Sequence, residues 1–183
     1  MNAAKAVARI NPHIHRFERG IVGFGALNDR DILLALSLIT SEGAKLLARV
    51  LYAGQPEYLK NLHLCLALEF NCLAGREGWN FPANEIAGVC YTAILEYISP
   101  RICQKCQGQE NIPDPANPLL IIRCPACEGM GGKAWSEWRR AKKAGIGITR
   151  WRNAWSGIYE KHVLLILDKY HDIFWSSLNR KLR

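Results

Sequence analysis

Cys103-Gln-Lys-Cys106 and Cys124-Pro-Ala-Cys127 are the two stretches that decide how this chain is organised, and seventeen residues separate them. Within each pair, the two-residue gap allows both thiolates to face one ion, and the separation of the pairs is typical of a four-thiolate zinc site. Four thiolates fill a tetrahedral coordination sphere and leave no position for a catalytic water. The sequence therefore predicts one structural Zn²⁺ bound by Cys103, Cys106, Cys124 and Cys127.

The residues around the two pairs agree with a metal site. Gly108 follows the first pair, and Gly129 and Gly131 follow the second, where backbone amides must curl toward the sulfurs at positive φ. Arg101, Lys105 and Arg123 flank the cysteines and can offset the charge of a tetrathiolate centre. Two disulfides are the alternative. Seven cysteines would leave one unpaired, and no secretory signal precedes the chain, so we expect a reducing bacterial cytoplasm.

Working outward from the cysteines, the chain is predicted to be mainly α-helical. We expect an N-terminal arm (1–25), a helical lobe (26–100), a zinc-binding segment (101–132) and a basic helix-turn-helix region (133–183), with the metal holding the two helical parts together. Apolar spacing in the lobe predicts helices over 28–50, 58–73 and 82–97, with Asn28 or Asp29 as the first N-cap and Gly43 as an interruption. Between the cysteine pairs, 111–118 is expected to be a loop and 119–122 a short strand. Cys65, Cys72 and Cys90 are expected to pack in the core.

Charge is distributed unevenly along the sequence. Residues 133–183 contain twelve Lys or Arg against four Asp or Glu, which accounts for the whole net charge of +8. This asymmetry favours a polyanionic partner for the C-terminal part, with nucleic acid ahead of an acidic membrane surface. The longest apolar run, 32–39, is far shorter than the ~20 residues that cross a bilayer, so no membrane partner is expected.

The basic region has the order of a helix, a turn and a second helix. A short helix is expected over 135–144 and a tight turn at Gly145-Ile146-Gly147, and Thr149 is the expected N-cap of a longer helix that ends near residue 174. Apolar and aromatic side chains recur along the longer helix and should face the core: Trp151, Trp155, Ile158, Tyr159, His162, Leu165 and Ile166.

This order predicts contacts to duplex DNA. A helix-turn-helix presents the N-terminal end of its second helix to the major groove, where Arg can pair with guanine and Asn with adenine. The predicted DNA-binding residues are Arg139, Arg140, Lys142 and Lys143 for phosphates, and Thr149, Arg150, Arg152, Asn153 and Ser156 near the bases. Two alternatives remain open: these charges simply solvate the helices, or Trp135, Trp138, Trp151 and Trp155 stack on unpaired RNA bases. The helical spacing of the four tryptophans favours a core role over stacking.

Three runs of sequence carry a resemblance to a known family. They are Cys103-Gln-Lys-Cys106-Gln-Gly, Cys124-Pro-Ala-Cys127-Glu-Gly-Met-Gly, and Trp151 followed by Trp155, Ile158, Tyr159, Glu160 and Val163. Over about residues 27–163 the chain resembles the late-gene antiterminator Q of lambdoid bacteriophages. It departs from that family in the missing second glycine after the first pair, a shorter spacer than in the phage lambda member, and Trp155 at a position where a smaller apolar residue is usual.

The resemblance implies a transcription antitermination factor. Such a protein binds DNA within a phage late promoter, engages RNA polymerase that still holds sigma factor at a promoter-proximal pause, and makes it read through terminators. An elongation factor is a further candidate partner. A DnaJ-like zinc chaperone module is the alternative, since Cys-x-x-Cys-x-Gly-x-Gly recurs there in four copies, whereas this chain has two copies, one of them incomplete. No deaminase His-x-Glu, metalloprotease spacing or nucleotide-binding glycine loop is present, so no enzymatic activity is expected.

Overall fold

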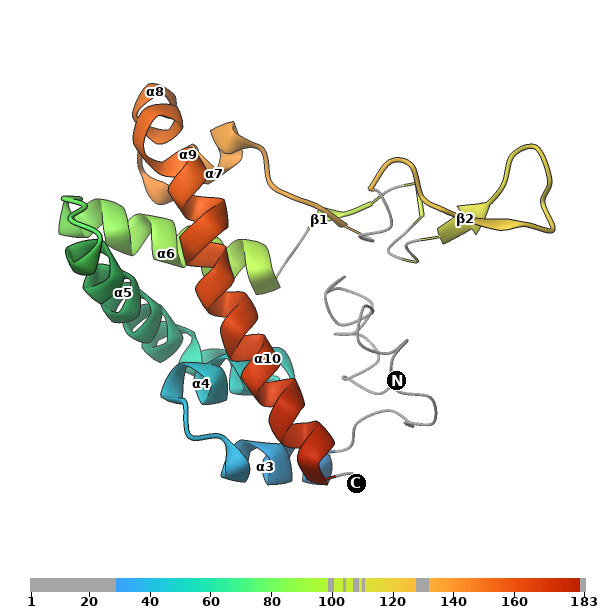
Figure 1. The fold of residues 1–183 in the computed structure, drawn as a ribbon, viewed down its shortest axis with the longest axis horizontal. Helices are drawn as coiled ribbons and strands as arrows, with labels where there is room; N and C mark the ends of the chain where they lie inside the picture. The colour runs from blue at the N-terminus through green and yellow to red at the C-terminus, as the bar shows by residue number, and fades with distance from the viewer. Residues whose placement is uncertain are drawn as a thin grey trace. The chain divides into compact units, whose positions relative to one another are not determined.

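The computed structural model describes residues 29–98, 101–103, 105–106, 109, 111–127 and 132–181. The fold is mainly helical, as predicted (Figure 1). The chain divides into two compact units: a helical unit (27–97 and 136–183) and a cysteine unit (1–26 and 98–135). Helices from both sides of the cysteine segment thus build one unit, which differs from the expectation that a metal joins two helical parts. The predicted N-terminal arm, Asn28 and the glycines at 108, 129 and 131 lie outside the described residues.

The first predicted helix of the helical unit is two helices. α3 (Asp29–Leu38) ends before a short break, and α4 (Glu42–Leu51) begins after Ser41, whose side chain accepts a hydrogen bond from the Ala44 N–H. Ser41 is an N-cap of ordinary type, and it places the break earlier than the predicted interruption at Gly43. Gly43 is buried inside α4, where an added Cβ would meet the ring of Tyr170 at 2.1 Å. Glycine at this position therefore allows close helix packing.

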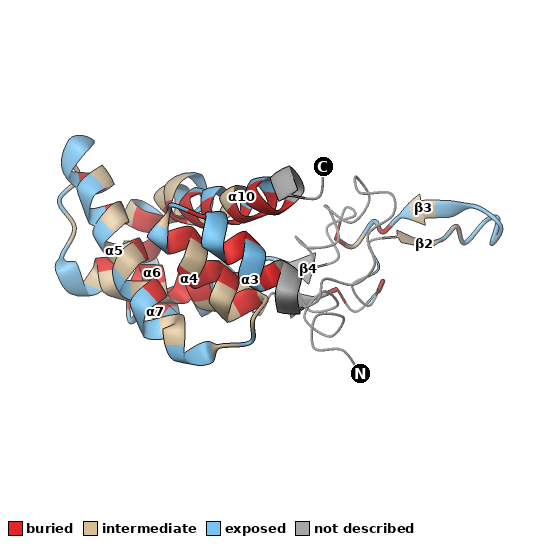
Figure 2. Cartoon of the chain, turned by 90° about the horizontal axis from the view of Figure 1, so that it is seen from below, coloured by how far each residue is buried: buried red, intermediate tan, exposed pale blue. Residues whose placement is uncertain are grey.

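The next two helices lie close to their predicted bounds. After the 3-10 turn η1 (Pro56–Tyr58), α5 (Leu59–Arg76) and α6 (Ala83–Ile98) each bury one face. In α5 the buried side chains are Leu62, Leu66, Phe70 and Ala74, at the four-residue spacing of one helical stripe. Figure 2 shows these buried stripes in red on the helices of this unit.

The basic region contains a helix, a turn and a second helix. α7 (Glu137–Ala144) is capped by Ser136, and Gly145 ends it at φ +72°, a left-handed conformation that glycine adopts without strain. The second helix begins with α8 (Ile148–Arg150) and continues through the turn η2 (Trp151–Trp155), α9 (Ser156–Ile158), the turn η3 (Tyr159–Val163) and α10 (Leu164–Lys181). Its N-cap is Gly147, so the prediction of Thr149 as the cap is wrong by two residues.

Two π-helical turns interrupt the second helix. In η2 the Ser156 N–H bonds the Trp151 carbonyl, and in η3 the Leu164 N–H bonds the Tyr159 carbonyl. The fully buried residues of this stretch recur at every fourth position: Trp151, Trp155, Tyr159, Val163 and Leu167. In a regular α-helix such a row would drift by about 40° at each step. The wider π turns counter this drift and keep the row facing the core.

α10 supplies much of the contact that closes the helical unit. It packs against α3, α4 and α5, as Figure 1 shows for α3 and α4. Tyr52 at the end of α4 stacks on Phe174 with ring centroids 4.5 Å apart, and Trp175 meets the same tyrosine edge-on. The predicted apolar face of the second helix is correct for Trp151, Trp155, Tyr159 and Ile166, whereas Leu165 is 59% exposed.

Among its described residues, the cysteine unit contains two short antiparallel strand pairs. β1 (Arg101–Ile102) pairs with β4 (Gly132–Lys133), and β2 (Asn111–Pro113) pairs with β3 (Ile121–Arg123) through the partners Ile112 and Ile122. The strand predicted at 119–122 is thus present at 121–123, but its partner at 111–113 was predicted as loop. Among the described residues, no helix is long and apolar enough to span a bilayer.

Candidate metal centre and nucleic-acid surface

The four predicted ligand cysteines come together in one buried cluster. Their sulfur atoms all lie within 4.8 Å of one another, with 3.8 Å between the sulfurs of Cys103 and Cys124 and 3.6 Å between those of Cys106 and Cys127. Sulfurs placed ~2.3 Å from one tetrahedral ion lie about 3.8 Å apart. Disulfide sulfurs would be ~2 Å apart, and all seven cysteines, each within the described residues, are free. This donor set could hold one metal ion, as the sequence predicted.

The local backbone explains how the two pairs meet. Pairing of β2 with β3 brings the residue after the second strand, Cys124, back toward the first cysteine pair. The loop of this hairpin is closed by Asp114 and Asn117, whose side chains accept hydrogen bonds from the Ala116 and Leu119 N–H groups. The cluster is shielded by Ile112 and Ala126, which pack against the four cysteines.

Backbone amides also lower the pKa of one thiol in the cluster. The Cys106 N–H, the main influence, outweighs burial and lowers the pKa of the Cys103 thiol to about 7. A thiol with a lowered pKa loses its proton to a metal at neutral pH more readily than an ordinary cysteine does. Lys105 and Arg123 lie nearby in sequence and are exposed.

The three remaining cysteines occupy different environments. Cys90 is fully buried, and burial raises the pKa of its thiol to about 12, as expected for a packing residue. Cys65 is half-buried on α5. Cys72 is exposed, so the prediction that it packs in the core is wrong, because α5 buries positions 66, 70 and 74 and turns position 72 outward.

Most of the predicted DNA-binding residues lie on the surface of the helical unit. The exposed ones are Arg139, Lys142 and Lys143 on α7, Thr149 and Arg150 on α8, and Arg152 and Asn153 in η2. Ser156 is half-buried. The first turns of the second helix therefore carry four of the five side chains that were predicted to approach bases.

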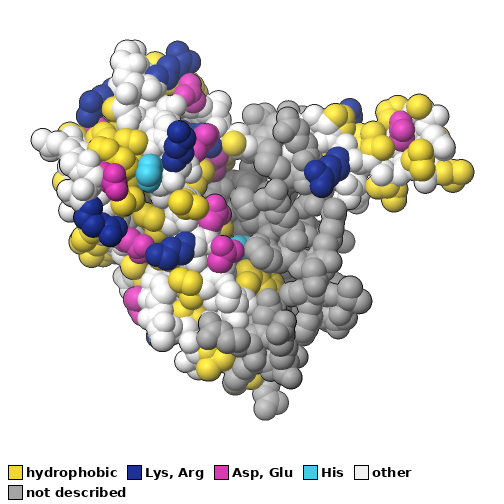
Figure 3. Space-filling model, viewed as in Figure 1, with side chains coloured by type: hydrophobic (Ala, Val, Ile, Leu, Met, Phe, Trp, Pro, Cys, Tyr) yellow, Lys and Arg dark blue, Asp and Glu magenta, His cyan; other side chains and the backbone are white. Residues whose placement is uncertain are grey.

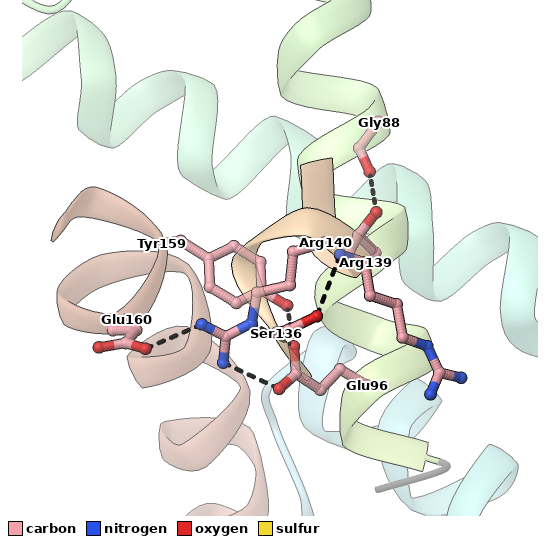
Figure 4. A network of polar contacts seen from close by, with 8 residues as sticks. Gly88, Glu96, Ser136, Arg139, Arg140, Tyr159 and Glu160 are labelled. Atoms are coloured by element: carbon pink, nitrogen blue, oxygen red, sulfur yellow. Dashed lines mark hydrogen bonds and ion pairs between the residues drawn. The ribbon is translucent and has the colours of Figure 1, made fainter. Parts of the chain in front are cut away.

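Arg140 differs from this expectation because it is buried. Its Nε and Nη2 donate to the two carboxylate oxygens of Glu96 at 2.8 and 2.9 Å, and its Nη1 donates to Glu160 at 2.8 Å (Figure 4). The Tyr159 hydroxyl donates to the same Glu96 carboxylate at 2.8 Å. Burial by itself would lower the pKa of Arg140, but the two carboxylates outweigh it and raise the pKa. Arg140 thus fastens α7 to α6 and the second helix instead of facing a phosphate.

Arg150 and Arg152 are exposed, yet each also contacts a carboxylate. Arg150 donates from Nε and Nη2 to the two oxygens of Glu85, at 3.3 and 3.2 Å. Arg152 donates from Nε to Glu137 at 3.1 Å. Burial alone would raise the pKa of Glu85, but the Trp155 indole hydrogen bond and the Arg150 guanidinium outweigh it and lower the pKa.

These ion pairs reduce the charge asymmetry that the sequence suggests. Glu85 and Glu96 belong to the neutral first part of the sequence, but they lie beside arginines of the basic part. On the face drawn in Figure 3, Lys and Arg side chains of the helical unit are interspersed with Asp and Glu. Charges that are segregated in sequence are therefore partly mixed in space.

Sequence reasoning missed two further surface features. Trp138 is 61% exposed on α7, with the Lys142 ammonium 4.9 Å from its ring centroid, whereas its spacing had suggested a core role. Trp151 and Trp155 are fully buried and Trp135 is buried, so these three side chains cannot stack on bases.

The tip of the β2–β3 hairpin is the second feature. Leu119, Leu120 and Ile121 are 91%, 54% and 76% exposed there. The run of prolines and leucines at 113–121 was the only available signal for this apolar tip.

Comparison with known proteins does not place the chain. No protein-family model, curated protein or solved structure matches it.

Proposed function

We propose that this protein binds duplex DNA through α7 and the N-terminal turns of the second helix. One observation carries the proposal: Thr149, Arg150, Arg152 and Asn153 are exposed together on those turns, beside the cations of α7. The helix order and the left-handed turn at Gly145 support a helix-turn-helix of the DNA-binding type. The first group would contact base edges, and Arg139, Lys142 and Lys143 would contact phosphates.

We propose that the four-cysteine cluster binds one structural Zn²⁺. Cys103, Cys106, Cys124 and Cys127 would fill its coordination sphere, and the ion would supply cross-linking of the strands and no catalysis. The sulfur separations and the lowered pKa of Cys103 support this assignment. The proposed activity of the protein is accordingly binding, without an enzymatic step.

The wider role that we propose rests on the resemblance to the Q antiterminators. In that role the DNA site is a phage late promoter element in a bacterial host cell. The protein partners are RNA polymerase holoenzyme with sigma factor and, as a further candidate, an elongation factor. The cysteine pairs and the Trp151–Trp155 stretch support this role through their sequence alone.

Salt-dependent binding tests the DNA proposal directly. Neutralisation of three phosphates by Arg139, Lys142 and Lys143 predicts that log affinity falls with log salt at a slope of about −2.7. Lys142→Ala should weaken binding to every duplex alike and make the slope shallower by about 1. Run-off transcription with holoenzyme, a candidate promoter and a terminator template tests the antitermination role. Absence of any salt-sensitive binding would reject DNA as the ligand.

One observation favours a second candidate function. The exposed apolar tip at Leu119, Leu120 and Ile121 resembles a surface that could hold unfolded chains, which supports the DnaJ-like alternative. Suppression of client aggregation that is lost in Leu119→Ser, together with no DNA binding, would favour this function over the first.

A further inference from the structure

Arg150 is held by a carboxylate in a way that Arg152 is not. Two parallel hydrogen bonds join Arg150 to Glu85, one to each carboxylate oxygen. A single contact joins Arg152 to Glu137, and that pair is open to solvent, with side-chain exposures of 64% and 41%. A bidentate pair fixes the plane of a guanidinium, whereas a single exposed contact leaves it free to swing.

Glu85 is itself anchored from behind. The Trp155 indole N–H donates to its Oε2 at 2.8 Å, and the side chain of Glu85 is only 16% exposed. Trp155 is fully buried, with its ring 4.1 Å from that of Phe81 and 5.7 Å from that of Phe70. Glu85 also lies in the first turn of α6, where the helix dipole favours a negative charge. The buried Trp155 ring and its hydrogen bond therefore hold the Glu85 carboxylate in one position.

The edge of Arg150 that remains available matches guanine. Glu85 occupies Nε and one hydrogen of Nη2, which leaves Nη1 and the outer hydrogen of Nη2 pointing away from the carboxylate. Two parallel N–H groups of a guanidinium are the donors that pair with guanine O6 and N7 in the major groove. Arg150 is 48% exposed on its side chain, so this outer edge can reach a ligand.

We propose that Glu85 is a positioning residue that aims Arg150 at a guanine and so sets the sequence preference of the protein. This inference rests on the proposed DNA-binding function. Glu85 acts through Arg150 and makes no contact with DNA itself. Within the part of the chain that the structure describes, Glu137 is held by Arg152 alone, so it has no such role for Arg152.

The experiment begins with the wild-type protein and a pool of randomised duplexes. Enrichment of a sequence by repeated selection supplies the probe, and a scrambled duplex of equal length is the reference. If no sequence is enriched and no duplex is bound, the proposed function fails. If duplexes are bound but none is enriched, the positioning role alone is overturned, because no preference exists for it to set.

Fluorescence anisotropy at one salt concentration then gives the affinity ratio between the selected and the scrambled duplex. Glu85→Gln should lower this ratio about tenfold, as should Arg150→Ala, because each removes the fixed pairing to one base. In the Arg150→Ala background, Glu85→Gln should change the ratio by less than about twofold, because the two residues act as one unit. Trp155→Phe keeps the aromatic core but removes the indole N–H, and should lower the ratio in the same direction by a smaller factor.

Glu137→Gln is the matched control. It removes one carboxylate beside an arginine on the same surface, and should raise affinity for both duplexes by about two- to fivefold while leaving the ratio unchanged. A merely structural role of Glu85 would weaken both duplexes alike and would not move the ratio. The proposal is overturned if Glu85→Gln preserves the ratio, or if its effect persists in full in the Arg150→Ala background.

Discussion

At the residue scale, the buried ion pair of Arg140 with Glu96 joins α7 to α6. Their side chains are 6% and 8% exposed. Removal of Glu96 takes away two of the hydrogen bonds of the buried Arg140 guanidinium and leaves it with the more exposed Glu160, so Glu96→Leu should lower the free energy of unfolding by ~3–5 kcal/mol. Addition of Arg140→Met should recover most of that loss, since two apolar side chains can pack together.

Urea denaturation of the two single variants, the double variant and Lys142→Met measures this coupling. Lys142 lies on the same helix but is exposed, so its replacement should change stability by less than about 0.5 kcal/mol. Strictly additive losses in the double variant would contradict the account of a single, mutually dependent pair.

A second residue-scale prediction concerns Glu85 and acid. The carboxyl pKa of Glu85 in the folded protein lies below its ordinary value of 4.5. The unfolded chain therefore takes up this proton first, and the stabilising effect of Glu85 is present above pH 4.5 and disappears as the pH falls through the folded pKa. The difference in unfolding free energy between wild type and Glu85→Gln should shrink from pH 7 to pH 3 in urea titrations. A difference that stays constant or grows in acid would speak against the ion pair.

At the element scale, α6 and α7 approach so closely that one helix has no room for a side chain. A Cβ added at Gly88 would lie 2.2 Å from the Ala144 carbonyl oxygen, which is fixed backbone. Gly88→Ala should therefore force the helices apart and destabilise the unit by ~1–3 kcal/mol. Gly75→Ala on α5 is the matched control, because a Cβ there meets nothing within 4 Å. Gly75→Ala should raise the stability by ~0.5–1 kcal/mol. If thermal melts show that both substitutions stabilise, or that both destabilise, the contrast is refuted.

The elements that were predicted well are those with a complete local signal. α5, α6 and α7 combine a regular apolar stripe with a start or stop residue, and their observed bounds differ from prediction by a few residues. The break between α3 and α4 was predicted a few residues too late, at Gly43, because a glycine in a helical sequence suggests an interruption, whereas this glycine is buried against the ring of Tyr170. The π turns were missed because they arise from tertiary packing, which keeps a row of buried side chains facing the core. Such packing leaves no pattern in the local sequence.

At the scale of the whole molecule, sequence reasoning identified the four cysteines that cluster, but it did not show that acidic residues from the first part of the sequence lie beside the basic residues of the last part. Spacing alone is sufficient for a four-thiolate site, because both pairs must face one point. The predicted phosphate contact at Arg140 could not be corrected from sequence, since its partner Glu96 is 44 residues away. The distribution of charge on the surface depends on the fold. The packing of α6 against the C-terminal helices places Glu85 and Glu96 beside arginines, and this determines which basic side chains can contact a ligand.

The last prediction follows from the division into two units. A structural zinc contributes ~10–16 kcal/mol of apparent binding free energy at neutral pH, and the strands around it are too short to persist alone. The helical unit, however, has its own core of Phe70, Trp151, Trp155 and Tyr159. Metal chelation, or Cys124→Ser, should therefore abolish hydrogen-exchange protection over 111–127 and leave the protection of α5 and α6 intact. Cys72→Ser, an exposed thiol on α5, should affect neither region. Loss of protection in α5 and α6 upon chelation would contradict this prediction. It would mean that the metal stabilises the helical unit as well as the cysteine unit, because the two would then open together.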